Sequence, residues 1–327
     1  MTAEPGLHRR VQRLMGNRFE ISVVSDDADW ANARIDEAIA EISRIEALLT
    51  TFSDQSQTNQ INAKAGISPV RVDAEVFALI QRSLRLSDLT QGAFDITYGS
   101  IDKRLWNFDA TLTQLPDPET ARQMVQLINY RNVLLNADES TIFLKEKGMR
   151  IGFGGIGKGY AAEQAKRVLR GGGVEHGIVN AAGDLTTWGN QPNGQPWTIG
   201  IADPGAADRN GPRLDGPRQA FSYFAISNMA VATSGNYEKY AVIDGKRYSH
   251  TIDPKTGFPV SGIKSVTIMA PNAELADALA TPVMVMGVRV GLDLINQMRQ
   301  IACVIIDDTD SLFTSDNIRI TDRANTL

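Results

Sequence analysis

The chain has 327 residues, a length that suits one large domain or two small ones. Its formal net charge of −5 argues against a general nucleic-acid-binding protein, because such proteins are usually basic. Apolar residues make up 43% of the sequence and charged residues 22%, which is ordinary for a soluble globular protein. We therefore expect a globular chain with no nucleic-acid partner.

The single cysteine, Cys303, lies in an apolar run, and we expect a buried, inert thiol in preference to a nucleophile. One cysteine and three histidines exclude a zinc-ligand cluster. No apolar run reaches the roughly 20 residues that a membrane span needs, and residues 1–13 lack the apolar core of a secretory signal. We therefore expect no membrane span and a cytoplasmic location, or a periplasmic one if a leader has been removed.

The first third of the chain predicts one strand followed by two amphipathic helices. Residues 19–24 alternate as in a strand, and residues 29–49 and 74–90 carry apolar residues at helical spacing. Asp73 is expected to cap the second helix. Between the helices, Phe52 stands in a polar loop, where an aromatic ring is either a core plug or a platform for a flat ligand.

Asp95 follows the second helix and sits between apolar neighbours. Its carboxylate is either a local cap or a group that reaches into a site. A helix is expected at 120–128, with Pro118 tolerated in its first turn, and strands are expected near 132–135 and 141–144.

A glycine-rich stretch at residues 151–160 lies between the strand that ends at residue 144 and a helix predicted at 161–169. Glycine permits positive φ and a close approach to a ligand, and the N–H groups at a helix start favour an anion. Lys158 adds a positive charge there. The stretch is either a cradle for nucleotide phosphates or a tight turn between strand and helix. It fits neither GxGxxG nor GxxxxGK[ST], because Gly159 stands where Ser or Thr should follow the lysine.

The C-terminal half predicts mainly strands. A strand at 177–185 ends on small residues and one acid, and a sharp turn is expected at Gly235. Residues 205–219, rich in Gly, Pro and Arg, are expected to form an exposed excursion. Helices are expected after the capping residue Asn272 and at 288–298. The remaining strands are expected at 197–202, 221–226, 265–269, 301–306 and near 317–320.

Asp277 and Thr281 are four residues apart in the helix that follows Asn272, so they share one face. With a backbone carbonyl and substrate phosphates, these oxygen donors suit Mg²⁺. The alternative is a surface acid beside a back-bonded threonine. Because the helix is mostly apolar, we expect Asp277 to be partly buried and to need a partner. His250 lies at a strand end, where a general base, a phosphate contact and a structural histidine all remain open.

Short blocks along nearly the whole chain resemble, in the same order, the motifs of the ApbE family, the FAD:protein FMN transferases. The block at 154–161 is similar to the family's G-G-I-A-K-G-Y-A, the block at 250–257 to H-I-I-D-P-x-T-G, and the block at 276–281 to A-D-A-L-A-T. The other blocks are residues 15–16, 51–53, 56–62, 92–97, 180–185 and 232–237.

The resemblance implies a set of site residues. It places Met15 and Phe52 near the flavin of a bound FAD, Ala93, Phe94 and Asp95 along the pocket, Lys158 at the glycine loop, and His250 and Thr251 beside it. It implies Mg²⁺ on Asp277, Thr281 and a loop carbonyl, that of Gly155 with Gly157 as the alternative. Asp277, His250 and Lys158 are the catalytic candidates.

The implied reaction moves the FMN half of FAD onto a threonine hydroxyl of an acceptor flavoprotein and releases AMP. FAD is thus a substrate, and the acceptor is modified after translation. The implied fold is α+β and T-fold-like, with residues 1–327 forming a single domain of two lobes with FAD between them.

This chain departs from the family pattern at three positions. Gly152 stands where the family has an aspartate expected to contact the cofactor, Gly157 replaces an alanine, and Thr251 replaces an isoleucine. Because of Gly152, a flavin-binding protein without turnover stays open. A Mg²⁺-dependent FAD pyrophosphatase also stays open, because it would use the same site with water in place of the threonine.

Overall fold

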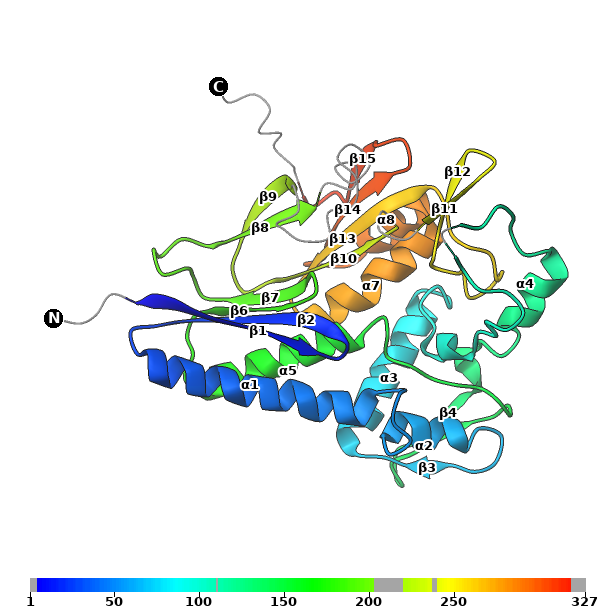
Figure 1. Cartoon of the computed structure of the whole chain (residues 1–327), viewed down its shortest axis with the longest axis horizontal. Helices are drawn as coiled ribbons and strands as arrows, with labels where there is room; N and C mark the ends of the chain where they lie inside the picture. Colours follow the sequence, from blue (N-terminus) through cyan, green and yellow to red (C-terminus); the bar gives the residue numbers. More distant parts are fainter. Residues whose placement is uncertain (1–4, 110, 203–219, 237–239, 319–327) are drawn as a thin grey trace. The chain divides into compact units, whose positions relative to one another are not determined.

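The computed structural model describes residues 5–109, 111–202, 220–236 and 240–318 (Figure 1). The chain divides into two compact units, each built from segments that are distant in the sequence. Unit 1 comprises residues 1–43, 158–238 and 263–327, and unit 2 comprises residues 44–157 and 239–262. The expectation that the two form a single domain stays a prediction.

Unit 1 is built on an eight-stranded sheet in which every pair of neighbouring strands is antiparallel. Its strands, in spatial order, are β1 (Gly6–Leu14), β2 (Asn17–Ser25), β6 (Gly177–Ala181), β7 (Asp184–Trp188), β10 (Ala230–Gly235), β13 (Ile263–Ala270), β14 (Ala302–Asp307) and β15 (Leu312–Thr314).

Helices cover one face of this sheet and a hairpin covers the other (Figure 1). The helices are α1 (Ala28–Leu49), whose first part belongs to unit 1, α5 (Gly157–Gly171), α7 (Ala273–Met286) and α8 (Val288–Asn296). Helix α7 packs on β10 and β13 at the middle of the sheet. The hairpin is formed by β8 (Trp197–Ala202) and β9 (Ala220–Ile226).

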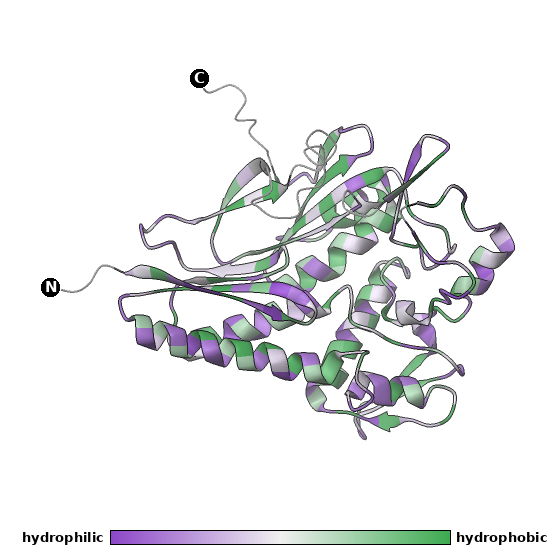
Figure 2. Cartoon of the chain, viewed as in Figure 1, coloured by the Kyte–Doolittle hydropathy of each residue, from purple (hydrophilic) through white to green (hydrophobic). Residues whose placement is uncertain are grey.

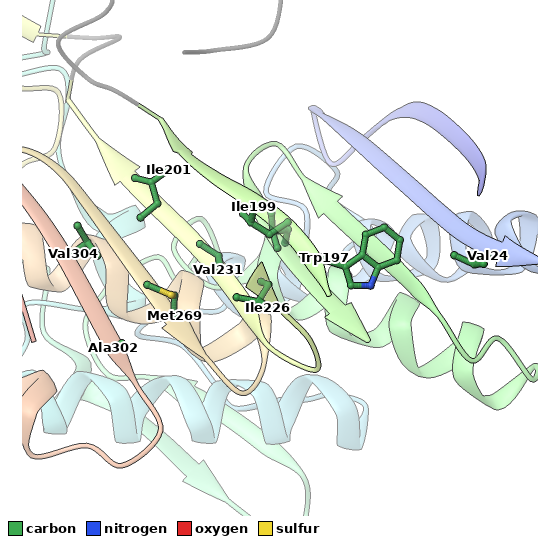
Figure 3. Close-up of a cluster of buried hydrophobic side chains, with 10 residues drawn as sticks. Val24, Trp197, Ile199, Ile201, Ile226, Val231, Met269, Ala302 and Val304 are labelled. Atoms are coloured by element: carbon green, nitrogen blue, oxygen red, sulfur yellow. The ribbon is translucent and has the colours of Figure 1, made fainter. Parts of the chain in front are cut away.

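The hairpin buries an apolar cluster against the sheet (Figure 3). Alternate residues of β8, namely Trp197, Ile199 and Ile201, point at the sheet and are at most 9% exposed. They pack with Val231 and Met269. Because helices cover the opposite face, every residue of β13 is buried. Helix α7 therefore packs on a central strand, β13, that is buried along its whole length.

Figure 2 shows polar and apolar stripes along α1, and its buried residues recur at the predicted spacing of three and four, from Ala31 and Ile35 to Leu49.

Unit 2 contains the end of α1, a three-stranded sheet of order β3-β5-β4 and a separate hairpin. Its other elements are α2 (Gln57–Ala63), β3 (Val70–Arg71), α3 (Ala74–Leu89), η1 (Ile96–Ser100), α4 (Pro118–Val125), η2 (Tyr130–Asn132), β4 (Val133–Asn136), β5 (Thr141–Leu144), β11 (Tyr240–Ile243) and β12 (Lys246–Ser249).

The α+β class is confirmed, as are the predicted helices to within a few residues. Several local expectations were wrong. Strand β1 was missed, and residues 177–185 form two strands instead of one. Strand β10 at residues 230–235 was also not predicted, although it ends at Gly235, where the turn was expected. The structure adds a strand at 312–314, and the strand expected near 317–320 lies partly outside the described residues. Asp73 stands at the N-cap of α3 but makes no side-chain capping bond. The excursion expected at 205–219 lies outside the described residues.

Cys303 is fully buried in β14, so its expected burial is confirmed, and burial raises the pKa of its thiol to about 12. Within the described ranges, none of the helices combines the length and the apolar character that crossing a bilayer requires. The cellular location stays a prediction.

Candidate functional site

In unit 1, the first turn of α5 places Lys158 between two carboxylates. The Lys158 ammonium hydrogen-bonds to Asp184 Oδ2, at the start of β7, and lies 3.3 Å from Asp277 Oδ1 on α7. Both acids are nearly buried, with 5% and 6% of their surface exposed. Three elements that are distant in the sequence thus meet at one group of charges.

Asp277 is held by a second donor from the same helix turn. The Gly159 N–H donates to Asp277 Oδ2 at 2.9 Å. A Cβ at Gly159 would lie 2.1 Å from the Ala273 carbonyl oxygen and 2.7 Å from Asp277 Cβ. Only glycine therefore allows α5 to approach α7 this closely. The expectation that Asp277 is buried and needs a partner is confirmed.

Hydroxyl groups continue this cluster along α7. Thr281, one helical turn after Asp277, shares a hydrogen bond of 2.9 Å with Ser234 Oγ on β10. The neighbouring Thr233 donates its backbone N–H to Asp184 Oδ1 at 3.4 Å. Strand β10 therefore positions both the threonine hydroxyl and the second acid.

The charges of the cluster influence one another. Burial opposes the charge on Lys158, but the Asp277 and Asp184 carboxylates outweigh it and raise the pKa of the ammonium. The pKa of Asp184 rises to about 6, first because burial penalises its charge and then because Asp277 lies nearby, while Lys158 opposes both effects. Lys158 is therefore a cation at neutral pH.

The donor set fits a hard cation. Asp277, Thr281, Ser234 and Asp184 offer carboxylate and hydroxyl oxygens, the ligand types that Mg²⁺ prefers. Among the residues that the structure describes, no group of three or more His, Cys, Asp or Glu residues is arranged for a metal. A site here would therefore rely on few protein ligands, which is usual for Mg²⁺.

Gly155, the expected carbonyl ligand, belongs to unit 2, three residues before Lys158. It lies in a turn closed by a hydrogen bond of 3.2 Å from the Ile156 N–H to the Phe153 carbonyl oxygen. None of the glycines between residues 152 and 159 has a positive φ, so the stretch does not use the left-handed conformation that glycine permits. A Cβ at Gly155 would lie 3.5 Å from the Phe94 ring.

Phe52 is 97% exposed, which rules out a core plug, and its role as a platform for a flat ligand stays a prediction. Hydrogen bonds from a buried side chain hold the polar loop around Phe52 in place. The buried Asn59 side chain donates to the carbonyl oxygens of Thr51 and Ser53 at 2.9 and 3.0 Å. Unit 2 therefore presents the Phe52 ring on a fixed loop.

Asp95 is a local cap. Its carboxylate accepts hydrogen bonds from the Thr97 N–H and hydroxyl at 2.8 and 2.6 Å, and from the Tyr130 N–H at 3.0 Å. Burial raises its pKa, although these bonds oppose the rise. Ala93 and Phe94 are each 7% exposed, and contact of these three residues with a cofactor stays a prediction.

His250 and Thr251 follow β12 in unit 2, as expected for a strand end. The exposed His250 ring packs edge-on against Phe108 with 6.3 Å between centroids, and Phe108 packs in the same way against Trp106. The Thr251 carbonyl oxygen accepts from the Val260 N–H at 2.9 Å. The structure shows an aromatic contact for His250, and its catalytic role stays a prediction.

Met15 and Gly16 form the two-residue turn of the β1–β2 hairpin in unit 1, with φ of 51° and 70°. A left-handed conformation costs a residue other than glycine about 1–2 kcal/mol. Such strain at a partly exposed methionine is a reason to expect a function there.

The structure joins Lys158, Asp277 and Thr281 in one cluster of unit 1 and adds two residues that the list of candidates missed, Asp184 and Ser234. The only signal for Asp184 was an acid after small residues at a strand end. At Gly152, the nearest atom to an added Cβ would be Thr51 Cγ2 at 3.9 Å, so a side chain has room there.

Comparisons with known proteins test the family that the sequence blocks predict. The ApbE family model matches residues 15–305. FAD:protein FMN transferases of Klebsiella pneumoniae and Treponema pallidum are 31% and 30% identical, and the matches cover 94% and 86% of this chain and 91% and 79% of those proteins. The ApbE protein of Thermotoga maritima has a TM-score of 0.81 at 29% identity, covering 95% of this chain and 97% of its own. The Pseudomonas stutzeri flavinyl transferase ApbE has a TM-score of 0.79 at 27% identity, covering 95% and 94%. The chain therefore belongs to the ApbE family of flavin transferases, as its sequence blocks predict.

Proposed function

We propose that this chain transfers FMN from FAD to a threonine hydroxyl of an acceptor protein and releases AMP in a Mg²⁺-dependent reaction. The names of its relatives supply the flavin and the protein acceptor. The observation that carries the proposal is the cluster in which α5 brings Lys158 against Asp277, one helical turn from Thr281.

Asp277, Thr281 and the carbonyl of Gly155 would hold the metal, with Gly157 as the alternative carbonyl. Bound Mg²⁺ would neutralise charge on the diphosphate of FAD. Lys158 adds a fixed positive charge beside Asp277, which favours the same diphosphate. Phe52 offers an exposed ring on which an isoalloxazine can stack, and Met15 is the second flavin contact.

In the proposed reaction, the threonine oxygen forms a bond to the phosphorus of the FMN half. The bond between that phosphorus and the bridging oxygen breaks, and the oxygen leaves with AMP. The hydroxyl proton passes to a base, for which His250 is the candidate because its imidazole is exposed and a neutral imidazole nitrogen can accept a proton.

The test uses the whole chain with FAD, Mg²⁺ and an acceptor that carries the target threonine, followed by separation of the flavin products. Protein-bound FMN with equimolar AMP supports the transferase. Free FMN with AMP indicates a pyrophosphatase, and intact FAD indicates a binding protein. An acceptor with valine in place of the threonine is the control, and labelling of that acceptor would contradict a hydroxyl attack.

The glycine at position 152 allows a second experiment, which measures FAD affinity. Because an added Cβ would meet only Thr51 at 3.9 Å, Gly152→Asp restores the family's acid without a clash at Cβ. We expect tighter FAD binding in this variant, measured by fluorescence titration. Unchanged affinity would show that the acid has no part in binding FAD in this chain.

A further inference from the structure

Lys158 does not share its charge equally between the two carboxylates. Its ammonium hydrogen-bonds to Asp184, but it lies 3.3 Å from Asp277 Oδ1, which is longer than the 2.7–2.9 Å of a strong charge-assisted bond. Asp277 has its closer bond through its other oxygen, from the Gly159 N–H at 2.9 Å. Asp277 Oδ1 is therefore the more weakly held oxygen of the pair.

Asp184 is in turn fixed by the sheet. It is the first residue of β7, and its Oδ1 accepts from the Thr233 N–H of β10. Thr233 is itself anchored by a hydrogen bond of 2.9 Å between its hydroxyl and that of Thr267 on β13. Since β10 and β13 are neighbours at the centre of the sheet, these bonds tie Asp184 to the sheet as well as to Lys158.

The arrangement has a consequence for cation binding. Without Asp184, the ammonium would have Asp277 as its carboxylate partner in this cluster, and the ammonium and a metal ion would compete for one oxygen. With Asp184 present, the two carboxylates and one ammonium carry a net charge of about −1 in a nearly buried place, which favours an added cation.

We propose that Asp184 is a positioning residue that holds the Lys158 ammonium away from Asp277 Oδ1 and so keeps this oxygen available to a divalent cation. The inference rests on the metal site of the proposed function and adds a residue that acts on the metal through Lys158. Lys158 accordingly lowers the metal affinity of Asp277, and Asp184 relieves that competition.

Metal affinity, measured by calorimetric titration of the whole chain with MgCl₂ or MnCl₂ in the absence of FAD, tests this directly. We expect Asp184→Asn to weaken binding about tenfold or more, because Lys158 then pairs with Asp277. Lys158→Met should strengthen binding, because it removes the competing cation. In the double variant, the effect of Asp184→Asn should shrink to about threefold or less, since its route through Lys158 is gone.

The double-variant comparison separates positioning from loss of charge alone. If Asp184 acted only by its negative charge, Asp184→Asn would weaken binding by the same factor with and without Lys158, and that result would overturn the inference. Asp293→Asn, at an exposed position on α8, is the matched control and should leave the affinity unchanged. Circular dichroism and melting in EDTA check the fold, and Lys158→Gln replaces Lys158→Met if the latter does not fold.

The outcomes distinguish this inference from the proposed function. A wild-type chain that binds no metal, or an Asp277→Asn variant that binds it as the wild type does, overturns the metal assignment and this inference with it. Binding that is lost in Asp277→Asn but unchanged in Asp184→Asn overturns the role of Asp184 alone.

Discussion

The contact between α5 and α7 depends on the absence of a side chain at Gly159. A methyl group there would lie 2.1 Å from the Ala273 carbonyl oxygen and 2.7 Å from Asp277 Cβ, distances that packed atoms do not reach. Neither neighbour is the flexible end of a side chain, so Gly159→Ala must push the two helices apart. The hydrogen bond of 2.9 Å from the Gly159 N–H to Asp277 Oδ2 would then lengthen or break.

The expected change in the free energy of unfolding combines two destabilising effects and one smaller stabilising effect. Overpacking of a well-packed contact costs about 1–3 kcal/mol, and loss of a hydrogen bond to a charged group costs about 1.5–3 kcal/mol. Alanine gains about 1 kcal/mol over glycine in a helix interior, and less in a first turn. We therefore expect Gly159→Ala to lower the free energy of unfolding by about 2–4 kcal/mol.

Gly171→Ala is the matched control, because Gly171 ends the same helix and an added Cβ there has no heavy atom within 4 Å. Urea denaturation of both variants and the wild type measures the difference. The control should stay within about 1 kcal/mol of the wild type. If Gly159→Ala is as stable as Gly171→Ala, the close approach of the two helices is refuted. The dependence of the Gly159–Asp277 hydrogen bond on that approach is then refuted as well.

Three further predictions address single residues. Asp277→Ala should abolish FMN transfer because it removes the proposed metal ligand; unchanged product yield by chromatography would contradict the assignment. Phe52→Ala should change the free energy of unfolding by less than about 0.5 kcal/mol, because the ring is 97% exposed. The same variant should weaken FAD binding about tenfold through lost stacking, and equal affinity by fluorescence titration would exclude the platform. Native Cys303 should resist iodoacetamide at pH 8 and react in urea, since burial raises the pKa of its thiol to about 12; rapid native labelling would contradict its burial.

The features that the sequence predicted well are local ones. The helix carrying Asp277 and Thr281 could be predicted from a capping asparagine, a run of apolar residues and a spacing of four. In the structure, Asn272 Oδ1 indeed accepts from the Leu275 N–H at 2.9 Å. Because the flanking residues are apolar, the same pattern also indicated that Asp277 is buried.

The features that were missed depend on contacts between distant segments. Asp184 joins Lys158 only because residues 177–185 bend at Ala182, which has a φ of 55° that its residue type does not favour. Asp95 caps the turn that follows it through Thr97, but the sequence did not indicate that its other carboxylate oxygen also accepts from Tyr130, in a separate segment. Strand β1 was missed because its arginines interrupt the apolar alternation, although Arg10 pairs with Asp36 of α1 and Arg9 with Glu20 of β2.

The glycine-rich stretch still has two interpretations, and Gly154 separates them. The boundary between the two units falls within the stretch, after Gly157. Packing explains why residue 159 is a glycine, because a side chain there would prevent α5 from approaching α7. Packing does not explain Gly154, since it is exposed, has no positive φ and would place an added Cβ more than 4 Å from any heavy atom. If the stretch is only a tight turn, Gly154→Ala should leave FAD affinity unchanged and stabilise the fold by about 0.4–1 kcal/mol.

If the stretch cradles phosphates, the added methyl group of Gly154→Ala occupies the surface that the diphosphate approaches. The stability gain should then remain, while FAD affinity falls about tenfold or more, a loss of about 1.4 kcal/mol in binding free energy. Measuring unfolding and FAD binding on the same preparation removes misfolding as an explanation, because a variant that is more stable than the wild type has kept its fold. A variant that gains stability and binds FAD as well as the wild type would exclude contact between the backbone at Gly154 and the diphosphate, leaving Lys158 as the positive group of this stretch.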